Sequence, residues 1–238
     1  MASSAELELT GRGILVTGAT GGIGRAVADS LAEAGAELFL VARTRDRLEA
    51  VAAELSATAL PGDAGDPADV AALRDGLAGE DVYGLVNAAG TFGLAPVAET
   101  EPALLERMLH GNLRAPILMT RALLPGMLER GAGHILTVGS VAGRVALPGN
   151  GAYAASKYGV RGFHEVLALE LRGTGVRATL VEPAATDTRI WDPLDPDARD
   201  DLPGRDAMLS PDAVADAVIF ALTRPPSVSI PTVAVQRS

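Results

Sequence analysis

The stretch Thr17-Gly18-Ala19-Thr20-Gly21-Gly22-Ile23-Gly24 follows a short apolar run, Gly13–Val16, and precedes apolar residues at helical spacing. A glycine-rich turn between a strand and a helix exposes helix N-terminal amides, whose partial positive charge suits a phosphate. In such a turn Gly18 allows the tight bend, Gly22 lets a pyrophosphate approach the backbone, and Gly24 lets the helix pack against the strand. The alternative is a glycine-rich connection without a ligand, since three residues separate Gly18 from Gly22 where the usual G-x-G-x-x-G has one.

The rest of the chain alternates short apolar runs with longer amphipathic ones. Runs such as Leu38–Val41 are typical of parallel strands that are buried on both faces. We therefore expect an α/β fold: one single-domain, Rossmann-type, doubly wound sheet over residues 1–238, seven-stranded and mostly parallel, with helices on both faces. Strands are expected near 13–16, 37–42, 60–63, 84–87, 134–139, 176–182 and 228–235, and helices near 25–34, 45–55, 67–77, 102–128, 153–172 and 211–222.

Prolines and short polar residues mark helix starts and interruptions. Asp66 before Pro67 is expected to cap one helix, and Ser210 is expected to cap the last one. Pro116 and Pro125 are expected to bend or interrupt the helix at 102–128, because proline lacks a backbone N–H.

Composition excludes several classes of function. The 238 residues contain no cysteine, which rules out disulfides, thiolate metal sites and a cysteine nucleophile. The three histidines (His110, His134 and His164) lie in unrelated segments without metal-ligand spacing, so no metal is expected. A formal net charge of −10 disfavours a nucleic-acid or membrane surface. Without a signal-peptide pattern in Met1–Thr10 or a long apolar run, a cytoplasmic protein is expected.

Cofactor choice is expected at the end of the second strand, which reads Val41-Ala42-Arg43-Thr44-Arg45. In this topology an acidic residue there holds the ribose 2′-hydroxyl of NAD, whereas an arginine accommodates the 2′-phosphate of NADP. No carboxylate is present, and Arg43 is the first residue of the loop. The alternative is a solvated arginine pair, but the guanidinium matches a phosphate and favours NADP(H).

Tyr153 and Lys157 are four residues apart and therefore share one helix face. The pKa of an ordinary tyrosine is about 10, and a neighbouring ammonium is expected to lower the pKa of Tyr153. The pattern alone also fits an exposed helix face. However, Lys157 is the only lysine in the chain, among 20 basic residues, so the sequence uses arginine wherever a positive charge suffices. We therefore interpret the pair as an acid/base unit.

With these motifs the chain resembles the short-chain dehydrogenase/reductase family, and the resemblance covers nearly the whole sequence. The matching elements occur in family order: the glycine turn, Asp63, Asn87-Ala88-Ala89-Gly90, Asn112, Ser140, the Tyr153–Lys157 pair, and Pro183 through Thr188. Two positions depart from the pattern, because Ala88 stands where a second Asn is common and Ala184 stands where a Gly usually follows the proline.

The resemblance implies roles for these residues. Ser140 would orient a substrate carbonyl, Tyr153 would donate a proton to its oxygen, and Lys157 would bind the nicotinamide ribose and lower the pKa of Tyr153. Asn112 would hold a water that connects Lys157 to solvent. The residues expected to bind NADP(H) are Gly18, Thr20, Gly21, Gly22, Ile23, Gly24, Arg43, Asp63, Ala64, Asn87, Ala88, Gly90, Tyr153, Lys157, Pro183, Thr186 and Thr188.

A hydrolase is a poorer interpretation. Gly139-Ser140-Val141-Ala142-Gly143 matches the G-x-S-x-G elbow, but an acid and then a histidine should follow it. His164 does follow, but it belongs to the helix that carries Tyr153.

Residues 187–206, rich in Asp, Pro and Arg, are too long for an ordinary connection. Because they follow the carboxyl end of a strand, where ligands bind in such folds, we expect them to form a substrate loop or lid. A solvated loop is the alternative.

The expected function is hydride transfer between NADP(H) and a small carbonyl or secondary alcohol, in an enzyme that forms a dimer or tetramer as the family commonly does. Two alternatives stay open: a dehydrogenase of 3-hydroxy acids or similar small polar alcohols, and a non-catalytic module that senses NADP. Neither Val141–Gly151 nor residues 187–206, which are expected to line the substrate pocket, carries a recognisable substrate code.

Overall fold

The computed structural model describes residues 9–238, and its seven strands form one sheet in which every neighbouring pair is parallel. The order is β3-β2-β1-β4-β5-β6-β7, so it reverses between β1 and β4 and opens a crevice at their carboxyl ends. The expected doubly wound sheet is confirmed, and it is parallel throughout. Its strands are β1 (Gly13–Thr17), β2 (Glu37–Ala42), β3 (Thr58–Pro61), β4 (Val82–Asn87), β5 (Gly133–Val138), β6 (Val176–Pro183) and β7 (Thr232–Val235).

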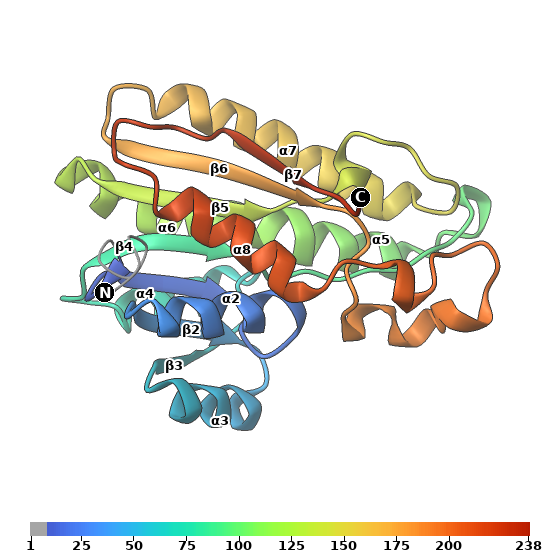
Figure 1. Cartoon of the computed structure of the whole chain (residues 1–238), viewed down its shortest axis with the longest axis horizontal. Helices are drawn as coiled ribbons and strands as arrows, with labels where there is room; N and C mark the ends of the chain where they lie inside the picture. Colours follow the sequence, from blue (N-terminus) through green and yellow to red (C-terminus); the bar gives the residue numbers. More distant parts are fainter. Residues whose placement is uncertain (1–8) are drawn as a thin grey trace.

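Helices cover both faces of this sheet. Helices α2 and α8 pack against each other on one face with α3 beside α2, and α4, α6 and α7 cover the opposite face. Figure 1 shows α2 and α8 side by side in front of the sheet. The helices are α2 (Gly22–Glu33), α3 (Arg45–Leu55), α4 (Pro67–Asp75), α5 (Pro102–Leu109), α6 (Ala115–Arg130), α7 (Gly151–Glu170) and α8 (Pro211–Leu222).

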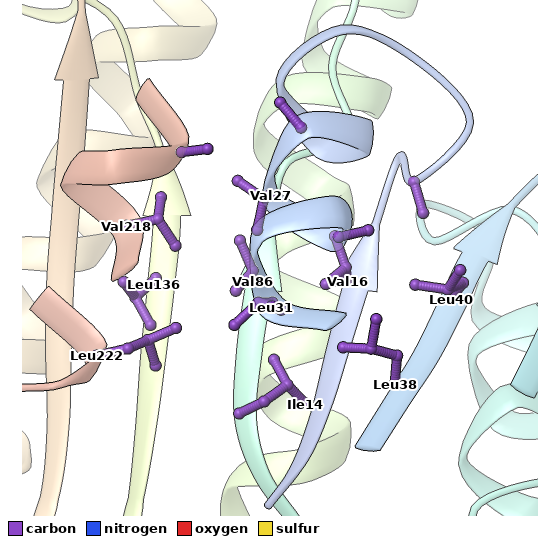
Figure 2. Packing of buried hydrophobic residues seen from close by; sticks show 14 of the residues in the cluster. Ile14, Val16, Val27, Leu31, Leu38, Leu40, Val86, Leu136, Val218 and Leu222 are labelled. Carbon is purple, nitrogen blue, oxygen red and sulfur yellow. The ribbon is translucent and has the colours of Figure 1, made fainter. Parts of the chain in front are cut away.

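Two apolar layers hold the helices to the sheet. In β1, Ile14 and Val16 point towards α2 and α8, while Leu15 points into the opposite layer, because successive side chains of a strand alternate between faces. Figure 2 shows the first layer, in which Val27 and Leu31 of α2 lie over the strands. The few aromatic residues contribute little to these layers, which consist mainly of Ala, Val, Leu, Ile and Met.

The segment 102–128, which was expected to be one helix bent or interrupted by two prolines, forms two helices. Helix α5 and helix α6 are joined by a π-helical turn, His110–Arg114, whereas Pro125 lies inside α6. Pro116 lies at the start of α6 and has no N–H for the carbonyl four residues earlier, which favours a wider turn just before it. The helix is therefore interrupted next to Pro116, as expected, whereas Pro125 does not interrupt α6.

Both expected caps are confirmed. The Asp66 side chain accepts hydrogen bonds from the backbone N–H groups of Ala68 and Asp69 at 2.8 and 3.0 Å, and Ser210 accepts one from Ala213 at 3.2 Å. Residues 187–206 fold into three short 3₁₀ turns at the edge to which the strands point (Figure 1).

Within the described residues, the structure contains neither a helix suited to span a membrane nor a cluster suited to bind a metal. No helix within residues 9–238 is long and apolar enough to cross a membrane. The same residues contain no group of three or more His, Cys, Asp or Glu side chains placed to hold a metal ion. The interpretation of Met1–Thr10 and the start of the expected domain at residue 1 fall mostly outside the described residues.

Candidate active site

A cavity of about 1450 Å³ lies at the carboxyl ends of the strands, where the strand order reverses. The loops after β1, β2, β4, β5 and β6 all open into it, together with α7 and residues 188–203. Of the expected site residues, three do not line it: Gly24, Asn87 and Asn112. Those that do are Gly18, Thr20, Gly21, Gly22, Ile23, Arg43, Asp63, Ala64, Ala88, Gly90, Ser140, Tyr153, Lys157, Pro183, Thr186 and Thr188.

The glycine turn depends on close backbone contacts. Gly18 has a φ of +72°, and a Cβ added there would lie 2.8 Å from the backbone N and Cα of Ala89. A Cβ at Gly24 would collide with the carbonyl oxygen of Gly18, which explains the close packing of α2. Gly22 was expected to leave open backbone, but a Cβ there would lie 2.9 Å from Thr188 Cγ2. The open position is Gly21, where nothing lies within 4 Å.

Two arginines mark the corner beyond the glycine turn. The exposed Arg43 lines the cavity, and no hydrogen bond or ion pair to it occurs among the described residues. Arg47 also lines the cavity, and its Nη2 donates to the Thr20 carbonyl at 2.9 Å. Sequence reasoning missed Arg47, although its place one helical turn after Arg43 was a usable signal. Two guanidinium groups beside exposed backbone amides suit a phosphate.

Asp63 forms the neighbouring wall of this corner. Its Oδ1 accepts from the Gly65 N–H at 2.8 Å and lies 3.1 Å from His110 Nε2 in the π-helical turn. Burial alone would raise the pKa of Asp63, but the Gly65 N–H, His110 and Arg43 together lower it. The carboxylate is therefore held in its ionised form.

Asn87 and Asn112 support the cavity from outside its wall. The Asn87 side chain is buried and lies 3.5 Å from Thr137 Oγ1. In the π-helical turn, Asn112 Nδ2 donates to the Thr91 carbonyl at 2.9 Å and to Ser156 Oγ at 3.1 Å, while its Oδ1 accepts from Thr91 N at 2.8 Å. Asn112 thus ties the loop after β4 to α7, and its expected role in holding a water stays a prediction.

Ser140, Tyr153 and Lys157 converge on the cavity from β5 and α7. Ser140 hydrogen-bonds to Tyr153. The Nζ atom of Lys157 lies 5.7 Å from the centroid of the Tyr153 ring and donates to the Val138 carbonyl at 3.0 Å. A hydroxyl pair beside an ammonium can orient a carbonyl oxygen and deliver a proton to it.

The pKa of Tyr153 differs from the expectation. Burial raises it above its ordinary value, and the hydrogen bond with Ser140 only partly opposes this effect. The net direction of the pKa shift is therefore opposite to the expected one. Burial in turn lowers the pKa of Lys157 to about 8. At neutral pH the tyrosine therefore carries its proton, and the lysine is mostly charged.

An arginine that sequence reasoning did not single out organises residues 187–206. Arg205 donates to Asp187 at 2.5 Å and to Asp192 at 2.7 Å, and its Nε lies 3.9 Å from Asp197. These three carboxylates therefore surround one guanidinium. Whether the segment closes as a lid stays a prediction.

Two aromatic residues missed by sequence reasoning flank the tyrosine. The Phe92 ring meets the Tyr153 ring edge-on with a centroid distance of 4.7 Å, and it lies 4.7 Å from the Trp191 ring. Both Phe92 and Trp191 line the cavity. The one available signal was that the single tryptophan of the chain falls in residues 187–206.

A family model described as short chain dehydrogenase matches residues 12–199, well over half of the sequence. The chain belongs to the short-chain dehydrogenase family. The NADP-dependent 3-hydroxy acid dehydrogenase YdfG of Salmonella typhi is 35% identical over 230 residues, which cover 92% of this chain and 92% of that protein. The glycine betaine reductase ATRR of Emericella nidulans is 36% identical over 93% of this chain, but the match spans only 18% of that longer protein.

A solved structure supports the same assignment. The short-chain dehydrogenase from Sphingobium yanoikuyae in complex with NADPH has a TM-score of 0.82 and 31% identity, covering 94% of this chain and 87% of that chain. The family predicted from the motifs is therefore confirmed, and so is the prediction of an oxidoreductase. The family does not by itself assign a substrate.

Lys157 is expected to reduce stability at neutral pH. Its pKa is about 8 in the folded protein and about 10.5 in the unfolded chain. The unfolded chain therefore binds more protons between these two pH values, and stability rises with pH there. The free energy of unfolding of Lys157→Met should therefore exceed that of the parent by roughly 2–3 kcal/mol at pH 7. At pH 10 this difference between the two proteins should be smaller by about 2 kcal/mol. Urea unfolding of both proteins at the two pH values measures this. A gap that does not change with pH would contradict it.

Proposed function

We propose that this chain is an NADP(H)-dependent oxidoreductase that transfers a hydride between nicotinamide and a small carbonyl or secondary alcohol substrate, with Tyr153 as general acid/base. The single observation that carries the proposal is the meeting of Ser140, Tyr153 and Lys157 in the cavity that the glycine turn also lines. The relatives named for NADP or solved with NADPH support the cofactor.

The residues of the cavity fit such a cofactor. Gly21 presents open backbone at the start of α2, where a pyrophosphate is favoured by the helix N-terminus. Arg43 lines the cavity with no hydrogen bond or ion pair within residues 9–238, and Arg47 lies nearby, which suits a 2′-phosphate. Asp63 and Ala64, expected beside the adenine, and Thr186 and Thr188, expected at the nicotinamide end, all line the cavity.

The chain's own groups perform the proton chemistry. When bound, the cofactor supplies the hydride for the carbonyl carbon or accepts it from the alcohol. The Ser140 hydroxyl donates a hydrogen bond to the substrate oxygen and orients it. Because the pKa of Tyr153 is raised, this residue holds its proton at neutral pH and gives it to the oxygen on which negative charge develops. The Lys157 ammonium then stabilises the resulting phenolate.

Dehydrogenation of a 3-hydroxy acid is the second candidate. The similarity to YdfG supports it, as does Arg107, which lines the cavity without an ion pair among the described residues. Its guanidinium lies against Gly93, directly after Phe92. An arginine in that position can pair with a substrate carboxylate. A non-catalytic NADP-sensing module gains no support, because the Ser140, Tyr153 and Lys157 set is intact.

We further propose a homo-oligomer, either a dimer or a tetramer. Tyr158, Val166 and Leu169 lie along one side of α7 and are 47%, 55% and 56% exposed. Such an apolar stripe on a helix is typical of a contact surface. The double variant Val166→Glu/Leu169→Glu should form smaller particles than the parent in light scattering at equal concentration. A parent that is already monomeric would exclude the proposal.

Tyr153→Phe removes only the hydroxyl that transfers the proton. We expect kcat to fall by at least about a hundredfold, because general acid/base groups contribute that much, while the Kd of NADPH stays within about twofold. A spectrophotometric assay of NADPH oxidation measures kcat, and a binding titration measures the Kd of NADPH. The matched control is Tyr158→Phe, on the exposed side of the same helix, which should keep full activity. Near-normal turnover by Tyr153→Phe would rule out its acid/base role.

Arg43→Ala should weaken the binding of NADPH much more than the binding of NADH. Loss of a guanidinium that pairs with the 2′-phosphate is expected to weaken NADPH binding by about tenfold or more, and to leave NADH binding nearly unchanged. Arg45→Ala is the control, because it removes the same charge two residues further along the chain. The Arg45 side chain pairs with Glu49 and does not line the cavity. Equal losses for NADPH and NADH would place the phosphate site elsewhere.

A further inference from the structure

Aromatic side chains are scarce in this protein but gather at the reacting tyrosine. The sequence has four Phe, three Tyr and one Trp, and Tyr153, Phe92 and Trp191 form one contact chain. They come from α7, from the loop after β4 and from the 3₁₀ turn Arg189–Leu194. Phe39, Phe163 and Tyr83 belong to the apolar layers between sheet and helices. The three rings of the contact chain line the cavity instead, which points to a role there.

The position of Trp191 is fixed on several sides. Its Nε1–H donates to the Thr186 carbonyl at 3.1 Å, and its ring leans on Phe92 at an interplanar angle of 58°. The next residue, Asp192, is held by Arg205. Both rings are only partly buried, so each leaves part of its surface open to the cavity. Such pre-positioned apolar surface is what a ligand group would cover.

The other side chains near these rings include both apolar and charged groups. Other apolar side chains that line the cavity are Leu94, Val141, Leu147, Ile190 and Leu202. Residues 187–206 contain seven aspartates against three arginines, so the segment is net negative. Of these charged residues, however, Arg189, Arg199 and Asp201 are the ones that line the cavity. The charges at the wall therefore do not exclude a substrate carboxylate, and the feature that favours an aryl group is the open ring surface of Phe92 and Trp191.

We propose that Phe92 and Trp191 form a substrate wall that selects carbonyl compounds bearing an aryl group, and the matching aryl carbinols in the reverse direction. This inference rests on the proposed function and narrows its substrate class. In the reduction, the carbonyl carbon gains the hydride and the carbonyl oxygen gains the proton of Tyr153, while NADPH is oxidised to NADP⁺ and solvent returns a proton to Tyr153. The aryl ring stacks on the wall while the carbonyl oxygen meets Ser140 and Tyr153.

The first experiment uses four methyl ketones that differ only in the second substituent: phenyl (acetophenone), cyclohexyl, ethyl (2-butanone) and carboxymethyl (acetoacetate). The proposal expects kcat/KM with NADPH to be highest for acetophenone, above acetoacetate and about tenfold or more above 2-butanone. Trp191→Ala should reduce the ratio of acetophenone to 2-butanone to near one, and Trp191→Phe should keep most of it. Phe220→Ala, which removes an exposed ring of α8, should leave the ratio unchanged.

A second measurement does not depend on turnover. Because Trp191 is the only tryptophan, fluorescence that is excited selectively at tryptophan and not at the three tyrosines reports on this wall. With NADP⁺ present no ketone is reduced, and acetophenone should change the emission saturably, after correction with a free tryptophan amide, whereas 2-butanone at the same concentration should not. Phe92→Leu should weaken the acetophenone response severalfold, and Phe220→Ala should not.

The outcomes separate this inference from the proposed function. If ketones are reduced but acetophenone has no advantage, or if acetoacetate is preferred, the aryl wall is wrong and the oxidoreductase stands. An unchanged preference in Trp191→Ala, together with no fluorescence response to acetophenone, likewise overturns the wall. If NADPH binds but no ketone or alcohol turns over, the proposed function fails, whereas a saturable fluorescence response alone would still support the wall.

Discussion

The junction between β1 and β4 is the constraint on which the rest of the site depends. The Thr17 hydroxyl oxygen accepts hydrogen bonds from the backbone N–H groups of Ala88 and Ala89 at 3.2 and 3.1 Å. The next residue, Gly18, touches Ala89 so closely that a Cβ has no room. These contacts bring together two loops that leave the sheet in opposite directions, at the point where the strand order reverses. The glycine turn and the loop after β4 therefore open into one cavity.

The same loop is fixed from its other side, which links the junction to the candidate chemistry. Asn112 joins Thr91 to Ser156, one residue before Lys157 on α7. That arrangement depends on the π-helical turn that carries Asn112, and such turns are common at functional sites because they redirect a side chain without ending a helix. Lys157 is held as a buried ammonium with one carbonyl partner. An arrangement of this kind costs stability, and a role in the reaction is a reason to retain it.

Local patterns predicted what depends on neighbours in sequence. The alternation of apolar runs predicted the sheet, and the spacing of Tyr153 and Lys157 predicted that they share a cavity wall. Contacts between distant segments were not predictable: Phe92 and Trp191 are 99 residues apart in number yet touch, and no periodicity connects them. The π-helical turn was missed because its apolar spacing resembles that of an ordinary helix. The pKa of Tyr153 was expected to fall, and it rises because desolvation depends on three-dimensional burial.

The two sides of the cavity are built differently, and this difference has a physical consequence. The proposed cofactor side relies on backbone geometry at glycines, whereas the proposed substrate side relies on side chains positioned by Arg205 and its carboxylate partners. Within the substrate side, the acidic segment acts through a field that salt screens over about 10 Å at ordinary ionic strength, while the aromatic wall acts only on contact. Charged groups therefore act mainly during approach and the rings act in the bound state, so rising salt would leave a preference for aryl groups in place.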